Sequence, residues 1–170
     1  MNEVILIGTS HSIQEGKINK EEFENYLIRL CEEYSIKSIA EETRHDCETI
    51  GKAIATQLSI AHIIIEPRLE EYESLGIENL NIIQKELFSR SDMHPVPNNI
   101  EDLPLSLKVE YHERLQKHMR DREKIWLEKI EDHNVYPLLI TCGADHFDCF
   151  SNLLQENNIS VNSESSKWGI

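Results

Sequence analysis

Short apolar runs separated by segments with helical periodicity constrain the fold of this 170-residue chain more than any other feature. Apolar runs cover residues 4–7, 60–65 and 136–142, further strands are expected at 36–40 and 159–161, and the run at 4–7 is continuously apolar. A continuous apolar run of this length is typical of a strand buried on both faces of a sheet. Helical segments between such strands indicate βαβ crossovers. We therefore predict a single α/β domain over residues 1–170, with a mostly parallel central sheet and flanking helices.

The middle of the chain departs from this alternation. Between about residues 68 and 104, one amphipathic helix pattern is followed by HPVPNN (94–99), which is typical of an irregular loop. We expect an insertion here, which is a lid, a dimer contact or an ordinary surface excursion. From Pro104 to about His133 the spacing predicts one long helix. Its inward face is expected to carry Leu105, Val109, His112, Met119, Trp126 and Ile130.

A formal net charge of −14 at pH 7 argues against two classes of partner. Nucleic acid and anionic membrane surfaces are bound through Lys and Arg side chains that neutralise phosphates, so we expect neither partner. The four cysteines form no CxxC pair, and the first residues, MNEVILIGT, lack the pattern of a signal peptide. These features favour reduced thiols and a cytoplasmic protein.

Polar side chains follow the ends of the predicted strands. Gly-Thr-Ser-His ends the first run at His11, Gly-Ala-Asp-His ends the fourth at His146, and Glu41 and Glu42 end the second. The carboxyl ends of parallel strands gather at one edge of a sheet, where ligands bind. A glycine directly after a strand permits a close backbone approach that a Cβ atom would obstruct. We therefore expect both histidines to turn back over this edge.

Two histidines with one or two carboxylates form a set of ligands suited to a divalent metal ion, which can activate water. The strand alternation leaves open which of Glu41 and Glu42 points into the site. The long helix adds Arg122 and Glu123 where its inward face crosses the sequence RDRE. A buried arginine there can clamp a carboxylate, a phosphate or a developing oxyanion, with Glu123 as its partner or as a further acid.

These residues also have plain structural alternatives. A single histidine in a loop is more often simply solvated, and Glu66 before Pro67 is typical of strand termination. Arg122 and Glu123 can equally form an ion pair at the edge of the helix face. The sequence alone does not decide among these interpretations.

The segments GTSH, IAEE, RDREKIWLEKI and GADHFDCFSNLL, taken in order, resemble the TraB/Tiki superfamily. That superfamily includes the PrgY and GumN-like groups and is distantly similar to erythromycin esterase-like and ChaN-like proteins. The resemblance implies an α/β fold and a metal-dependent hydrolase site. It makes His11 and His146 the paired motif histidines, Glu41 the strand-end acid, and Arg122 or Glu123 the helix residue. The chain is shorter than a typical member, and IAEETRHD departs from the usual acid, leucine, aspartate pattern.

Our leading hypothesis is a hydrolase that cleaves a peptide, ester or lactone bond in a small-molecule or peptide substrate. Mn, Co or Zn bound by His11, Glu41 and His146 would polarise a water molecule or a carbonyl group. Glu42 or the glutamate of the long helix would transfer the proton, and Arg122 would stabilise the developing negative charge.

Two rivals to this hypothesis remain at this point. In a metal-free variant, His11 or His146 acts as the general base. In a different class, the protein is a non-catalytic module that binds a small ligand or a protein in the same pocket. A homodimer is compatible with either class.

Overall fold

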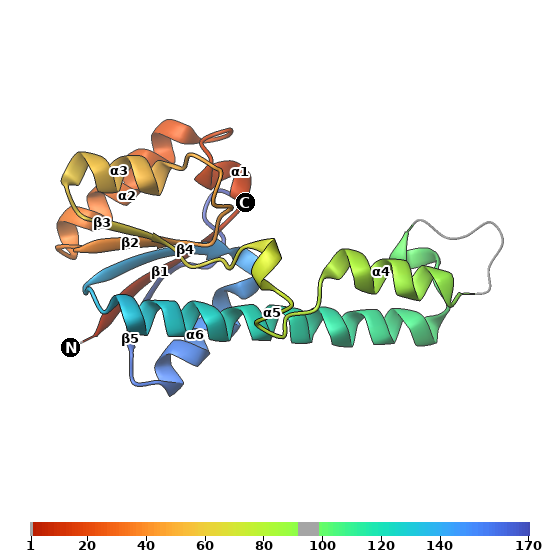
Figure 1. Ribbon diagram of the computed structural model, residues 1–170. Helices are drawn as coiled ribbons and strands as arrows, with labels where there is room; N and C mark the ends of the chain where they lie inside the picture. The colour runs from red at the N-terminus through yellow and green to blue at the C-terminus, as the bar shows by residue number, and fades with distance from the viewer. Residues whose placement is uncertain (1, 92–98) are drawn as a thin grey trace. The chain divides into compact units, whose positions relative to one another are not determined.

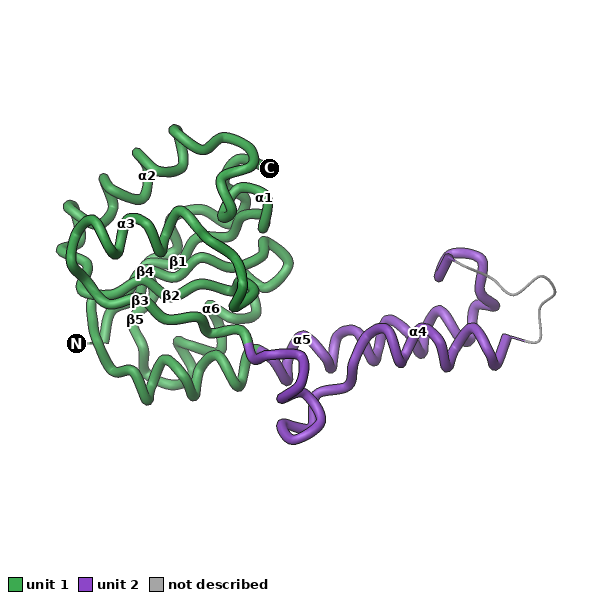
Figure 2. The backbone as a smooth tube through the Cα atoms, turned by 45° about the horizontal axis from the view of Figure 1, so that its top comes forward, with its two compact units in different colours: residues 1–66, 123–170 green, residues 67–122 purple. Residues whose placement is uncertain are grey.

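The computed structural model describes residues 2–91 and 99–170 and divides into two compact units (Figures 1 and 2). The first unit comprises Met1–Glu66 and Glu123–Ile170, and the second comprises Pro67–Arg122. The insertion expected at 68–104 falls inside the second unit, which also contains the first part of the long helix. Of the loop predicted at 94–99, residues 94–98 lie outside the described residues. A lid function for this segment stays a prediction.

A parallel sheet forms the centre of the first unit and confirms the predicted α/β fold (Figure 1). Its five described strands run in the order β3-β2-β4-β1-β5, and every pairing is parallel. The strands are β1 (Glu3–Thr9), β2 (Ser38–Glu41), β3 (Ala61–Ile64), β4 (Leu138–Gly143) and β5 (Ser160–Ser165). β1 is buried from Val4 to Thr9, because a strand inside a parallel sheet is covered on both faces.

Helices cover both faces of this sheet. They are α1 (His11–Gln14), α2 (Lys20–Glu33), α3 (Ile50–Leu58), α6 (Phe147–Glu156) and the part of α5 (Leu105–His133) that follows Arg122. One core cluster, which includes Phe23, Ile39 and Ile54, lies between the sheet and α2 and α3. The other, which includes Ala40 and Phe150, lies on the opposite face against α5 and α6. The short η3 (Ala144–His146) joins β4 to α6.

The second unit is built around a pair of helices with a small core. It contains η1 (Leu69–Glu71), α4 (Leu80–Ser89), η2 (Ile100–Asp102) and the first part of α5. The buried apolar residues that hold α4 against α5 are Ile83, Leu87, Leu103 and Leu107. Each of these side chains contributes roughly 1.5–3 kcal/mol when fully buried, and four partly buried residues, Leu80, Phe88, Ile100 and Tyr111, pack against them.

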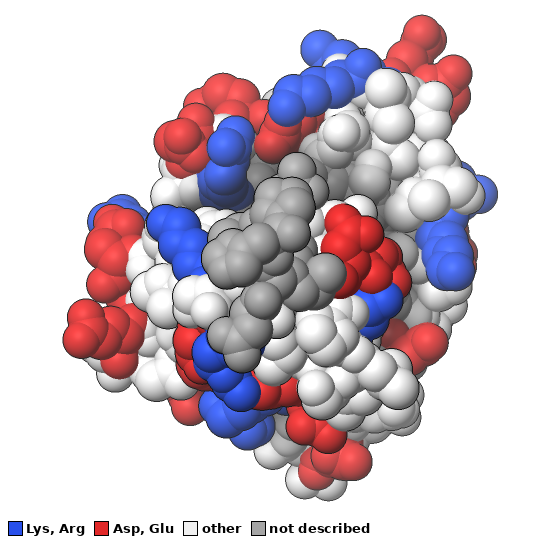
Figure 3. Space-filling view, turned by 90° about the vertical axis from the view of Figure 1, so that its right-hand side faces the viewer, with Lys and Arg blue, Asp and Glu red and all other residues white. Residues whose placement is uncertain are grey.

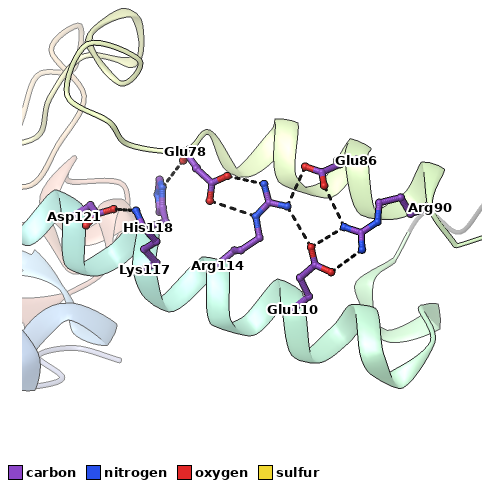
Figure 4. Close-up of polar contacts among 8 residues, drawn as sticks. All are labelled: Glu78, Glu86, Arg90, Glu110, Arg114, Lys117, His118 and Asp121. Carbon is purple, nitrogen blue, oxygen red and sulfur yellow. Dashed lines mark hydrogen bonds and ion pairs between the residues drawn. The ribbon is translucent and has the colours of Figure 1, made fainter.

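Ion pairs supplement that core (Figure 4). Arg114 donates to Glu78 at 2.6 Å and to Glu86 at 3.0 Å. Arg90 donates to both carboxylate oxygens of Glu110, at 2.7 and 2.9 Å. The hydrogen bond to Glu78 is the main cause that raises the pKa of Arg114 above its usual range. The guanidinium group of Arg114 therefore stays positively charged. This ladder fixes the register of α4 along α5.

The inward face predicted for the long helix is only partly correct. Trp126 and Ile130 are fully buried, but Leu105 is 77% exposed and Val109 is 49% exposed. His112 is exposed as well. The reason is that α5 belongs to two units with different cores. In the second unit, α4 packs on the side of α5 that carries Leu107, which is opposite to the side that carries Leu105 and Val109.

The described surface carries charges of both signs. On the face drawn in Figure 3, Lys and Arg side chains lie among Asp and Glu side chains, and the described residues form no continuous basic field there. Within the described ranges, none of the helices combines the length and the apolar character that a membrane span requires.

Candidate active site

The carboxyl ends of three strands bring both motif histidines to one carboxylate. His11 begins α1 just after β1, Glu42 directly follows β2, and His146 ends η3 after β4. Nε2 of His11 lies 3.9 Å from Oε1 of Glu42, and Nε2 of His146 lies 3.8 Å from the same oxygen. Glu42 and His146 are buried, whereas the His11 side chain is 58% exposed. Solvent therefore reaches this group of residues from the side of His11.

Glu42, rather than Glu41, is the strand-end acid beside the histidines. Side chains alternate between the two faces along β2, where Ile39 joins the core under α3 and Ala40 joins the opposite core. The backbone N–H of Glu42 still bonds to the carbonyl of Thr141 at 2.9 Å, so the alternation continues through this residue. Glu41 consequently points to the face of α3. It does not lie beside His11 and His146, as the family resemblance implied.

The carboxylate of Glu41 is enclosed in a separate network on that face. It accepts a short hydrogen bond from the hydroxyl of Thr49 and a 3.4 Å one from Thr141. Nε2 of His62 lies 2.8 Å from its Oε2. A Cβ atom at Gly51 would stand only 2.6 Å from the carboxylate, so α3 approaches it closely with its first turn. The amino end of a helix favours a negative charge, which helps to keep a carboxylate there at zero exposure.

The backbone of Gly143 fixes the position of Glu42. Its N–H donates to Oε2 of Glu42 at 2.6 Å, and a Cβ atom at Gly143 would lie 3.2 Å from that oxygen. The φ angle of Gly143 is −59°, which any residue adopts. The second Gly-x-x-His glycine therefore serves the close approach that we expected, and its conformational freedom is not needed.

His146 and Glu123 form a close buried pair in this site. Nδ1 of His146 lies 2.7 Å from Oε1 of Glu123, and the two residues are only 6% and 1% exposed. A carboxylate beside Nδ1 favours the tautomer with its proton on that nitrogen. Nε2, which faces Glu42, is then the ring nitrogen that accepts a proton.

Trp126 supports this imidazole from one turn further along α5. Residues three apart lie on one side of a helix, so Trp126 follows Glu123 onto the site. Its ring centroid lies 4.7 Å from that of His146, and its Nε1 donates to Oε2 of Glu66 at 3.1 Å. Glu66, which the sequence offered only as strand termination, thus helps to hold the indole ring in place.

Cys142 lies near the end of β4, and it has the properties of a structural thiol. Its side chain is fully buried. Burial raises the pKa of this thiol well above its usual range, and the charges of Glu42 and Glu123 add to the shift. Because the thiolate is the nucleophilic form, Cys142 is not suited to attack a substrate.

The structure does not bring the three expected metal ligands together. Within the described part of the chain, no three His, Cys, Asp or Glu side chains are grouped so that they could hold a metal ion. The expected ligand Glu41 faces the other side of the sheet, where Thr49, Thr141 and His62 occupy its oxygens. Binding of Mn, Co or Zn therefore stays a prediction.

Arg122 belongs to the second unit, as its last residue, and is partly buried. Successive helix residues point about 100° apart, so Arg122 and Glu123 do not face the same side of α5. Its expected role as an electrostatic clamp stays a prediction. Glu123 contacts His146, a partner that the sequence analysis did not name.

Comparison of the chain with protein-family models, curated proteins and solved structures gives no match. The likeness to the TraB/Tiki superfamily therefore stays an expectation from short motifs.

Proposed function

We propose that this protein is a cytoplasmic hydrolase in which His146 is the general base and Glu123 orients it. The observation that carries the proposal is the 2.7 Å contact between Nδ1 of His146 and the buried carboxylate of Glu123. A histidine oriented by a carboxylate, with its second nitrogen directed at other acid–base groups, is a recurrent device for activating a hydroxyl or a water molecule. All four cysteines are free thiols, in keeping with a reducing compartment.

Water is the nucleophile in this proposal. The separations of 3.8 and 3.9 Å between Glu42 and the two imidazoles are too long for direct hydrogen bonds. A water molecule within hydrogen-bonding distance of both groups spans such a separation. Nε2 of His146 would take a proton from this water as its oxygen attacks the carbonyl carbon. The negative charges of Glu123 and Glu42 would stabilise the imidazolium that forms.

His11 is placed for the second proton transfer. It lies on the solvent side of Glu42, where a substrate enters, and its ring is largely exposed. A protonated His11 would donate to the departing alcohol or amine as the carbon–oxygen or carbon–nitrogen bond breaks. The scissile bond is therefore an ester, a lactone or a peptide bond, and no step requires a metal ion.

The test is a hydrolysis screen with 4-nitrophenyl acetate, γ-butyrolactone and a dipeptide amide, carried out with EDTA and then with added Mn, Co or Zn. His146→Gln should lower the rate about 100-fold or more, the usual worth of a general base. His62→Gln is the matched control, because His62 also pairs with a glutamate at 2.8 Å but lies on the other face. Activity of His146→Gln equal to that of the unmodified protein would refute the proposal.

The same screen also tests the metal-dependent hydrolase and the non-catalytic binding module. Activity that appears only with added metal would restore the metal-dependent form of the hypothesis. Lack of turnover on every substrate would favour the non-catalytic binding module.

A further inference from the structure

Exposed apolar side chains gather in the second unit. Seven large apolar residues are exposed within the described ranges, and five of them belong to this unit. The five are Leu69, Leu75, Ile82, Leu105 and Val109. Single exposed apolar residues are normal on a soluble protein, but a concentration of them on a small unit is typical of an interface.

Part of this apolar surface is concave. A hollow of about 520 Å³ lies between the turn at η1 and the start of α4, and five of its nine lining residues are apolar or aromatic. Those five are Leu69, Tyr72, Ile77, Ile82 and Ile83. Leu69 and Ile82 are 61% and 63% exposed, so the hollow presents uncovered apolar surface to solvent.

The polar lining of the hollow is acidic. Glu70, Glu73 and Glu78 line it, and the described lining residues include no Lys or Arg. Glu78 is engaged by Arg114 at 2.6 Å. Glu70 and Glu73 are exposed, so they supply the negative charge that an incoming group would meet. The hollow therefore suits an apolar projection that carries a cation.

The first turns of α5 provide such a projection. Leu105 and Val109 are four residues apart, so they form one ridge on the helix, and they are 77% and 49% exposed. Lys108 lies beside Val109, and its ammonium group lies 3.5 Å from a carboxylate oxygen of the exposed Glu101. This ridge is the exposed half of the apolar face that the sequence predicted to be buried.

The ridge and the hollow of one chain are held apart. Arg114 and His118 of α5 contact Glu78 at the edge of the hollow. Leu105 lies nine residues before Arg114, which is roughly 14 Å along a helix axis. The ladder of ion pairs between α4 and α5 fixes this spacing, so the two complementary surfaces can meet only between two chains.

We propose that this protein forms a homodimer in which the Leu105 and Val109 ridge of each copy occupies the hollow of the other. Lys108 then lies near Glu70 and Glu73 of the facing copy. A two-fold axis repeats the contact, so the dimer buries both ridges and both hollows and closes without forming a filament. The inference does not depend on the proposed hydrolase activity.

Sedimentation velocity of the full chain at 5–100 µM tests the dimer. The expected particle has twice the chain mass of 19.8 kDa. Leu105→Glu and Ile82→Glu should each raise the dissociation constant at least about tenfold, because each places a carboxylate in the apolar contact. Ile18→Glu is the matched control, since Ile18 is 50% exposed but belongs to the first unit. A monomer throughout the range, or equal weakening by Ile18→Glu, would overturn the proposal.

Disulfide trapping then tests which surfaces meet. In a background of Cys47→Ser and Cys149→Ser, chains with Ile82→Cys and chains with Leu105→Cys should crosslink only when mixed. A crosslink in Leu105→Cys alone would show that ridge packs on ridge, which contradicts the proposed arrangement. Circular dichroism of each variant checks that the helices are retained.

Discussion

The two faces of the sheet each hold a histidine and a glutamate in close contact, yet the surroundings of the two pairs differ. His62 lies 2.8 Å from Glu41 on the face of α3, and His146 lies 2.7 Å from Glu123 on the face of α5. Glu41 also accepts from two threonine hydroxyls and has no exposure. His146, by contrast, also lies 3.8 Å from Glu42, a second carboxylate that has a second histidine, His11, at 3.9 Å.

This difference teaches that a short contact between His and Glu does not by itself identify an acid–base site. The pair of His62 and Glu41 links the neighbouring strands β2 and β3 to the first turn of α3. Its role is therefore structural. The pair of His146 and Glu123 directs one ring nitrogen toward Glu42 at the carboxyl ends of the strands, where ligands bind. Variants of the two pairs should therefore separate stability from activity.

The largest effect is expected on the face of α3. His62→Leu should lower the free energy of unfolding by about 3–5 kcal/mol, because it leaves the buried charge of Glu41 without its histidine partner. Urea denaturation measures the loss. His62→Gln, which keeps a hydrogen-bond donor, should lose much less. Unchanged stability of His62→Leu would contradict a structural role for this pair.

Glu123→Gln tests the opposite face. It should lower the hydrolytic rate constant about 100-fold, equivalent to about 2.7 kcal/mol in the barrier, because a neutral amide does not stabilise the imidazolium. The Michaelis constant should change little, since Glu123 contacts the histidine and not the substrate. Steady-state kinetics with the substrate found in the screen measures both constants. An equal loss in Glu41→Gln, corrected for its folded fraction, would show that the two faces are not distinct.

Gly51→Ala should destabilise the fold by about 2 kcal/mol, the middle of the range for overpacking a rigid site. The new Cβ atom would stand 2.6 Å from the carboxylate of Glu41, whose hydrogen bonds prevent it from moving away. The better helix propensity of alanine offsets only part of this cost. A thermal melt that shows a rise in stability would contradict the close packing described for α3.

Gly143→Ala is the corresponding change on the face of α5, and its effect should be smaller. Its Cβ atom would lie 3.2 Å from Oε2 of Glu42, so the carboxylate must shift by a few tenths of an ångström. We expect a stability change within about 1 kcal/mol and a fall in the hydrolytic rate of about fivefold, from misplacement of Glu42. A loss of stability without any loss of rate would assign Glu42 to the structure and not to the site.

The fold was predictable from the sequence because the central strands β1 and β4 are mostly apolar runs, as burial on both faces requires. The edge strand β5, SVNSES, is polar and only its start coincides with the predicted run at 159–161. The choice between Glu41 and Glu42 was not predictable. Adjacent strand residues point to opposite faces, and the face that holds the histidines depends on where β4 and α5 pack. The resemblance to a family favoured Glu41, whereas the geometry places Glu42 beside His11 and His146.

The pairing of Glu123 with His146 was also not predictable from the sequence. The two residues come from different elements, and a charge on a helix face does not reveal its partner. The spacing of Glu123 and Trp126 by three residues was a usable signal, because it places an acid and an aromatic ring on one side of α5. The exposed ridge at Leu105 was missed for another reason: one helix serves two units with separate cores.

The most direct test of the central claim is the tautomer of His146, observed through the ¹⁵N chemical shifts of its imidazole nitrogens at a pH where the ring is neutral. His146→Gln identifies the signals, and His62→Gln removes those of the other pair. We predict a proton on Nδ1, shared with Glu123, and an unprotonated Nε2 that serves as the base. A neutral ring with its proton on Nε2, or an average of both tautomers, would contradict the account.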